Sequence, residues 1–189
     1  MLSYHWDLVL RNTPLVLKHC PKCGSPSSYQ SSGNFRVNAN QNHIDVWLIY
    51  LCQKCSCSWN MEILSRRDCK TIARDLYDKF LTNDPELAFQ YAFDAMIHSR
   101  NKAVMDYGCL QYEIKGDKIS LPDLREAVEI EILCKHSVEL RLDKLLSRQL
   151  ETSREEIRRL EAGKRIFVEG CSSAMKAKVK NGLRINILP

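Results

Sequence analysis

The pattern of hydrophobic and polar residues in the first third of the chain is typical of β-strands. Short apolar runs, rich in β-branched and aromatic residues, are separated by polar turns. The run over residues 44–51 (IDVWLIYL) is almost continuous and predicts a central strand. Residues 25–33 are polar and predict a loop. We therefore expect an antiparallel β domain, which begins with a strand over residues 6–10.

From about residue 66 the hydrophobic period changes to that of helices. Apolar residues recur every four positions over residues 72–80, which predicts one amphipathic helix. A second helix is predicted over residues 84–96, because it opens with an Asp-Pro pair, and both residues are favoured at helix starts. Residues 110–114 and 128–132 alternate between apolar and polar positions, which predicts two short strands.

The last part of the chain predicts two short helices and two strands. A leucine stripe at residues 142, 145 and 146 indicates the first helix. Ser153 and Glu156 have the spacing of a capping box at the start of the second helix, and Gly163 suits a left-handed end of that helix. Residues 166–168 and 183–188 have the apolar character of strands in a small sheet.

The composition is that of a folded, soluble protein. The chain has 189 residues, of which 44% are hydrophobic, so it can bury an ordinary core. No run reaches the roughly 18 to 20 apolar residues that are needed to cross a bilayer. The N-terminus lacks the basic and then apolar layout of a signal peptide. We expect a cytoplasmic protein without a membrane partner.

The excess positive charge is concentrated near the C-terminus. The chain has a net charge of +5. Residues 138–189 hold 12 Lys and Arg against 7 Asp and Glu, whereas the preceding residues hold 16 of each. This asymmetry is expected of a module that binds a polyanion.

Four of the nine cysteines form two Cys-x-x-Cys pairs, Cys20 with Cys23 and Cys52 with Cys55. Thiolates at this spacing can take two corners of a zinc tetrahedron, and two such turns complete the site. Gly24 favours the first turn, whereas Ser56 stands at the equivalent position of the second. A thioredoxin-type redox pair would begin a helix in an α/β pattern. That pattern is absent, which argues against a redox pair. Sites with all four positions filled by protein ligands are usually structural, so we expect a structural Zn²⁺ rather than a catalytic ion.

The C-terminal part opens with RLDKLL at residues 141–146 and continues with Ser153-Arg154 and then residues 165–170. This pattern resembles the αL RNA-binding domain of the fourth small-subunit ribosomal protein. It implies that two helices present basic side chains to RNA. The expected RNA-binding residues are Arg141, Lys144, Arg154, Arg158 and Arg165, together with Arg148, which shares one helix face with Arg141 and Lys144 beside the leucine stripe. Glu161, Gly163 and Glu169 differ from the residues usual in that domain.

Four short motifs of the first half are CPKCG at 20–24, FRVNAN at 35–40, DVWLIY at 45–50 and Trp59-Asn60. Through them the chain as a whole resembles a bacterial family known as domain of unknown function ten-sixty-two. The resemblance implies a bacterial source and supports the architecture, but it implies no activity.

The expected fold is α+β in three consecutive parts. These are a zinc-ribbon-like antiparallel β domain over residues 1–64, a helical middle segment with short strands over 65–137, and an αL-type RNA-binding-like domain over 138–189. Two interpretations of the basic residues stay open, an RNA-binding surface and a solvated helix face with i, i+4 ion pairs such as Glu155 with Arg159.

The leading functional hypothesis is a non-enzymatic zinc protein that binds structured RNA, ribosomal or similar. The alternative is a zinc-ribbon adaptor for a protein partner or for DNA, whose C-terminal domain has lost RNA binding. Trp47 and Trp59 would then lie at the docking surface. An enzyme is a third class, but His43, His98 and His136 are isolated in sequence and no catalytic motif is present.

Overall fold

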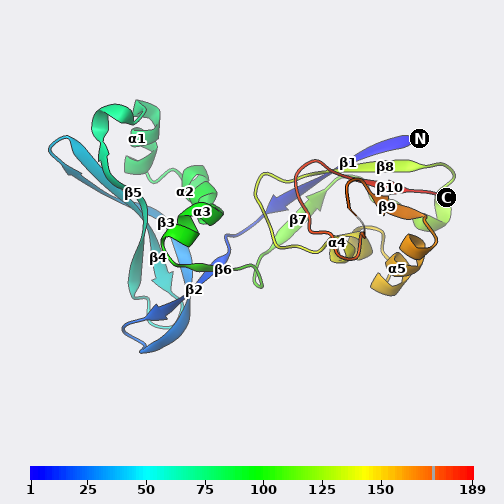
Figure 1. Cartoon of the computed structure of the whole chain (residues 1–189), viewed down its shortest axis with the longest axis horizontal. Coiled ribbons are helices and arrows are strands. Elements are labelled where there is room, and N and C mark those ends of the chain that lie inside the picture. The colour runs from blue at the N-terminus through cyan, green and yellow to red at the C-terminus, as the bar shows by residue number, and fades with distance from the viewer. Residues whose placement is uncertain (172) are drawn as a thin grey trace. The chain divides into compact units, whose positions relative to one another are not determined.

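The computed structural model describes residues 1–171 and 173–189, and these fold into two compact units (Figure 1). The first, which we call the outer unit, combines residues 1–11 with residues 111–189. The second, which we call the insert unit, comprises residues 12–110. The α+β class is confirmed, because each unit has its own five-stranded sheet with separate helices.

The outer unit is built on a sheet with the strand order β7-β1-β8-β10-β9. Its strands are β1 (Leu2–Leu10), β7 (Tyr112–Lys115), β8 (Val128–Leu133), β9 (Ile166–Val168) and β10 (Leu183–Ile187). β1 is parallel to β8, and the other pairs are antiparallel. Buried isoleucines of β8 and β10 form a core with the apolar faces of α4 (Leu142–Gln149) and α5 (Arg154–Ala162). A 3₁₀ turn, Leu121–Asp123, precedes β8.

The insert unit interrupts what would otherwise be a β-hairpin. β1 and β7 pair antiparallel from Asp7↔Lys115 to Leu10↔Tyr112. The Arg11 N–H donates to the Gln111 carbonyl at 2.9 Å, which continues this ladder up to the boundary of the two units. The chain thus enters and leaves the insert unit at adjacent points.

The insert unit has a sheet with the order β5-β4-β3-β2-β6. Its strands are β2 (Leu15–Cys20), β3 (Ser25–Asn40), β4 (His43–Cys52), β5 (Ser58–Asp68) and β6 (Val104–Asp106). After a 3₁₀ turn (Cys69–Thr71) come α1 (Arg74–Leu81), α2 (Pro85–Ala92) and α3 (Ala95–Arg100). These helices pack on one face of the sheet through aromatic contacts, such as Phe35 with Phe80 at 5.0 Å between ring centroids.

Three local predictions need correction. Residues 25–33 form the first half of β3 rather than a loop, because their backbone pairs with β2 on one side and β4 on the other. The helix predicted over residues 84–96 is two helices, since α2 ends at Ala92 and the Asp94 carboxylate caps α3. Gly163 has φ −77°, and it is Lys164, at φ 55°, that takes the left-handed conformation after α5.

The two units differ from the three consecutive parts that the sequence suggested. The predicted strand over residues 6–10 belongs to β1, which pairs with β7 and β8 instead of joining the β domain that follows it. Residues 111–137 contribute β7 and β8 to the same sheet as the C-terminal strands. Strand pairing between distant segments, rather than order along the chain, therefore defines the units.

Candidate metal centre and basic face

Four cysteines meet at one end of the insert-unit sheet. Two strand connections lie at that end (Figure 1). β2 ends at Cys20 and β4 ends at Cys52. β3 is antiparallel to both of these strands, so the β2–β3 turn and the β4–β5 turn lie at the same end of the sheet. These turns carry Cys23 and Cys55.

The two cysteine turns have equivalent backbones. The Gly24 N–H donates to the Cys20 carbonyl at 2.9 Å, and the Ser56 N–H donates to the Cys52 carbonyl at 2.8 Å. Gly24 has φ 65° and Ser56 has φ 57°, so both are left-handed. That conformation is unstrained for glycine but costs a residue with a Cβ about 1–2 kcal/mol. The second turn therefore holds its shape against a local strain that the first turn lacks.

The sulfur atoms have the spacing of a tetrahedral metal site. All four Sγ atoms lie within 4.8 Å of one another, with Cys20 Sγ 3.6 Å from Cys55 Sγ and Cys23 Sγ 4.0 Å from Cys52 Sγ. A tetrahedron with metal–sulfur bonds of about 2.3 Å has edges of about 3.8 Å, which lies between these two distances. The predicted set Cys20, Cys23, Cys52 and Cys55 is thus brought together and could hold a metal ion.

The thiols cannot all ionise together without a cation. A hydrogen bond from the Tyr29 hydroxyl lowers the pKa of Cys20 to about 6. The hydrogen bond with Cys55, together with burial, instead raises the pKa of Cys23 to about 12. Four thiolates at this separation repel one another, so a bound cation is needed to keep all of them deprotonated.

Aromatic side chains surround the thiol that is most readily ionised. Tyr29 is buried, and its ring lies edge-on to Trp59 at 6.2 Å between centroids. The Lys18 ammonium lies 4.8 Å from the centroid of the Trp59 ring. Tyr29 thus connects Cys20 to Trp59, so the fluorescence of this tryptophan can report on the state of the centre.

No other group of three or more ligating side chains is found among the described residues. Cys57 lies closest along the sequence, but its thiol is directed at the Ser58 carbonyl at 3.8 Å. Cys134 is buried in the outer unit and donates to the His136 carbonyl at 2.8 Å. These thiols have contacts of their own outside the centre.

The second cluster lies in the outer unit, where Asp143 brings together the starts of α4 and α5. Asp143 is 0% exposed. Arg141 donates to its carboxylate from Nε at 3.1 Å and from Nη2 at 2.9 Å, and Arg154 donates from the same two atoms at 2.9 and 2.5 Å. Burial alone would raise the pKa of Asp143, but the hydrogen bonds from Arg154 and Arg141 outweigh it and hold the pKa below its usual range.

The two arginines are only partly used by this contact. Their side chains are 57% and 51% exposed. A guanidinium carries five N–H donors, and the bonds to Asp143 use only Nε and Nη2, which leaves the Nη1 side available. Lys144 is exposed beside them, and Arg158 follows one turn after Arg154 on α5. We call Arg141, Lys144, Arg154 and Arg158 the basic face.

The other two predicted RNA-binding residues, Arg148 and Arg165, have side-chain contacts elsewhere in the outer unit. The Arg148 guanidinium lies 5.3 Å from the centroid of the Tyr112 ring on β7. Arg165 donates from Nε to the Leu188 carbonyl at 3.3 Å. Within the basic face, Arg158 also has an ion pair at the surface, with Glu155 at 2.6 Å.

Sequence reasoning missed the role of Asp143 and that of Glu161. In the RLDKLL segment Arg141 lies two positions before the aspartate, which was a signal for a local ion pair, although the complete burial of Asp143 was not evident. Glu161 breaks the αL pattern for a local reason. Its carboxylate accepts hydrogen bonds from the Ala174 N–H at 2.5 Å and from the Ser173 hydroxyl at 3.2 Å.

Charge is distributed more evenly between the folded units than along the chain. The outer unit holds 17 Lys and Arg against 14 Asp and Glu, a net of +3, and the insert unit holds 11 against 9, a net of +2. The difference from the sequence pattern arises because residues 111–137, with 4 basic and 6 acidic residues, fold with the C-terminal segment. The excess positive charge is therefore a property of the C-terminal segment rather than of the outer unit as a whole.

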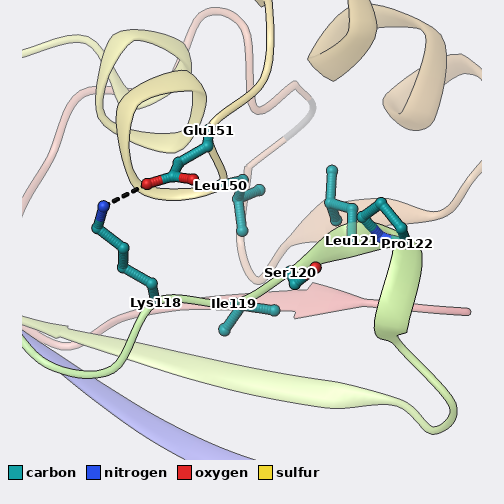
Figure 2. Close-up of a pocket in the computed structure, with 7 residues that line it drawn as sticks. All are labelled: Lys118, Ile119, Ser120, Leu121, Pro122, Leu150 and Glu151. Carbon is teal, nitrogen blue, oxygen red and sulfur yellow. Dashed lines mark hydrogen bonds and ion pairs between the residues drawn. The ribbon is translucent and has the colours of Figure 1, made fainter.

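A pocket in the outer unit shares no residue with either cluster (Figure 2). Ile119 and Leu150 are buried there, and Lys118 forms an ion pair with Glu151 at its edge. The hydroxyl of Ser120 donates to Asp123 at 2.7 Å. Because these polar groups are already paired, the pocket presents no convergent set of free polar groups for a ligand.

Together, the two sheets and the cysteine centre define an α+β protein with a candidate metal site. The chain belongs to the family described as protein of unknown function (DUF1062), which matches residues 37–171. The matched range includes Cys52, Cys55 and the whole basic face, but it begins after Cys20 and Cys23. Searches of curated proteins and of solved structures found no match. None of the described helices is long and apolar enough to cross a membrane.

Proposed function

We propose that the protein is a non-enzymatic, zinc-containing RNA-binding protein of the cytoplasm. In this proposal a structural Zn²⁺ at the four cysteines stabilises the insert unit, and the basic face of the outer unit contacts structured RNA, ribosomal or similar. Four cysteine ligands leave no open position for a substrate, which is the usual condition of structural rather than catalytic zinc.

The RNA proposal rests mainly on the cluster around Asp143. The carboxylate fixes two guanidinium groups from different helices in one orientation, and each keeps unused donors at the surface. Planar guanidinium groups that are held in advance lose little conformational freedom when they bind phosphate. Sequence-specific contacts are not required, because folded RNA is recognised largely by its shape and by its backbone. Lys144 and Arg158 would add charge at the edge of this pair.

The structure determines which variants can test this proposal. Arg154 is unsuitable, because its removal would leave Asp143 with only one of its two cationic partners. Lys144 and Arg158 are exposed and do not contact that carboxylate through their side chains. The double variant Lys144→Ala, Arg158→Ala should therefore keep the fold and remove two phosphate contacts.

The experiment is filter binding of purified bacterial ribosomal RNA at a series of salt concentrations. The affinity of the wild-type chain for RNA should fall as salt rises. In the double variant the plot of log K against log salt should be less steep, with the magnitude of its negative slope reduced by roughly 1.5 to 2. The matched control is Arg74→Ala, Lys79→Ala, which removes the same two charges from exposed positions on α1 of the insert unit. Equal binding by the two double variants would contradict the assignment of the basic face.

A protein-interaction adaptor is a second candidate, and one surface of the insert unit favours it. On the face of the sheet opposite α1–α3, the cross-strand neighbours Leu17 and Val104 are 44% and 62% exposed, and Leu51 is 39% exposed. Trp47 lies on this face beneath Arg36, whereas Trp59 packs against Tyr50 on the other face. A pull-down with Leu17→Ser, Val104→Ser tests this candidate. Protein partners that the wild-type chain still captures after nuclease treatment, but that this variant does not capture, would favour the adaptor.

A further inference from the structure

The segment after β9 places lysines beside the basic face. Burial alternates along residues 176–180, where Lys176, Lys178 and Lys180 are exposed while Ala177 and Val179 are buried. The three lysines therefore face solvent together. None of them belongs to the αL-like sequence pattern described above.

Backbone pairing fixes this segment against the start of α4. Arg141 and Lys178 form an antiparallel bridge. On either side of it, the Leu142 N–H donates to the Ala177 carbonyl at 2.9 Å and the Val179 N–H donates to the Leu140 carbonyl at 2.8 Å. Residues that are directly opposite in such a pair project to the same side. The lysines thus continue the basic face from Arg141.

Glu161 holds the beginning of the same segment. It lies in the last turn of α5, and its two carboxylate oxygens accept from the Ala174 N–H and the Ser173 hydroxyl. Arg141 holds the next residue through a bond from Nη2 to the Met175 carbonyl at 3.1 Å. The segment is therefore fixed to α5 by an anion and to α4 by a cation that belongs to the basic face.

We infer that residues 173–180 form a second phosphate-contacting element of the RNA surface and that Glu161 is its positioning residue. The inference rests on the proposed function. The side chain of Lys178 pairs with Glu139, whereas the side chains of Lys176 and Lys180 make no hydrogen bond or ion pair in the part of the chain that the structure describes. The latter two lysines carry the contact.

The direction in which RNA affinity changes when Glu161 is replaced distinguishes a positioning role from a purely electrostatic one. Glu161 is an anion close to a surface that binds a polyanion, so loss of its charge alone would strengthen RNA binding. If Glu161 instead positions the lysines, Glu161→Ala weakens binding although the surface becomes more positive. Glu161→Gln keeps one carbonyl acceptor for the Ala174 N–H and should retain most of the wild-type affinity.

The test measures binding of purified ribosomal RNA to the full chain over a salt series. Lys176→Ala, Lys180→Ala should weaken binding roughly tenfold and lower the salt slope by roughly 1.5 to 2. Glu161→Ala should move both quantities in the same direction, and its combination with the two lysine changes should add little, because the three residues act through one element. Glu169→Ala, which removes an exposed acid elsewhere in the outer unit, should leave binding unchanged or tighter.

The outcomes separate this inference from the proposed function. Unchanged binding by the lysine variant, or tighter binding by Glu161→Ala, would overturn the inference even if the Lys144→Ala, Arg158→Ala variant binds weakly. Absence of salt-dependent binding by the wild-type chain would overturn the proposed function instead. If Glu161→Ala fails to fold in a thermal unfolding control, the exposed lysine variant still decides the question.

Discussion

The cysteine centre of the insert unit and the Asp143 cluster of the outer unit both gather charged groups from separate elements, but they differ in where the balancing charge comes from. At the centre, four thiols converge from two strand ends and the turns that follow them, and the lysines of these turns, Lys22 and Lys54, are exposed. At Asp143, two arginines of the same unit supply the positive charge. The first cluster can therefore be fully ionised only with a cation from outside the chain, whereas the second has its counter-charges within the unit.

This difference has a consequence for each unit. A metal that binds only the folded state adds its binding free energy to stability, so the insert unit should depend on metal supply and on pH through its thiolates. The outer unit should be independent of metal. In this unit Arg141 and Arg154 stabilise the fold and also provide the proposed RNA contact, so replacing either arginine alone cannot separate the two roles.

Loss of the metal should have the largest effect. Cys52 is buried, and Cys52→Ser removes one of four ligands, so we expect loss of the bound ion and a fall of about 4 kcal/mol or more in the free energy of unfolding of the insert unit. A chelator should act on the wild-type protein in the same way. Metal content is measured by elemental analysis, and unfolding by tryptophan fluorescence, to which Trp59 contributes from beside the centre.

Cys57→Ser is the matched control, because it changes the nearest thiol outside the four-cysteine set. It should keep the metal content and lower stability by less than about 1 kcal/mol. A Cys52→Ser protein with wild-type metal content would show that Cys52 is not a ligand. Unfolding of the outer unit together with the insert unit on chelation would contradict the comparison between the two units.

Breaking the Asp143 cluster should have the next largest effect, confined to the outer unit. The double variant Arg141→Ala, Arg154→Ala leaves a carboxylate buried without a cation and should destabilise this unit by about 3–5 kcal/mol. Either single variant should cost less, about 1–3 kcal/mol, because one half-exposed arginine remains. Adding Asp143→Asn to the double variant should recover part of the loss. Urea unfolding of the full cycle measures these values, and additive single effects would contradict a shared anion.

The same cluster predicts a pH dependence with a definite sign. The folded pKa of Asp143 is lowered, so its carboxylate contributes fully above the unfolded pKa, about 3.9, and the contribution is lost as pH falls through the folded pKa. The stability difference between the wild-type protein and Asp143→Asn should be constant near neutral pH and shrink below about pH 4. A difference that grows on acidification would show that the carboxylate is not stabilised by its arginines.

The sequence was sufficient for features that depend on local chemistry. The Cys-x-x-Cys spacing, the Ser153 cap and the Asp84-Pro85 helix start each concern a few neighbouring residues, and the structure contains all three. The serine-rich start of β3 was misread because its strand character comes from pairing on both sides rather than from its own composition.

Other features depend on contacts between segments far apart in the chain. Leu2 pairs with Val128 although the whole insert unit lies between them in the sequence, and no local pattern specifies this pairing. Hydrophobic patterning assigns an aspartate to the surface, so it could not show that Asp143 is fully buried. The same limit hid the contact between Glu161 and Ala174, so from the sequence Glu161 looked like an acid added to the proposed RNA surface rather than a contact within the fold.

The smallest predicted effect concerns one left-handed residue in each unit, Ser56 beside the metal ligands and Lys164 after α5. Ser56→Gly and Lys164→Gly each remove the strain of a Cβ at positive φ, but glycine also loses more chain entropy on folding, so we expect a net gain of about 0.5–1 kcal/mol. Lys164→Ala keeps the strain and removes only the charge, so it should give no gain.

The two gains in stability, from Ser56→Gly and from Lys164→Gly, should differ in their dependence on metal. The gain at Ser56 should be measurable only in metal-loaded protein, where the second turn must hold its shape, whereas the gain at Lys164 should be the same with and without a chelator. Urea unfolding in both conditions measures this difference, and a Lys164→Gly gain that disappears with the metal would show that the outer unit is not independent of the centre.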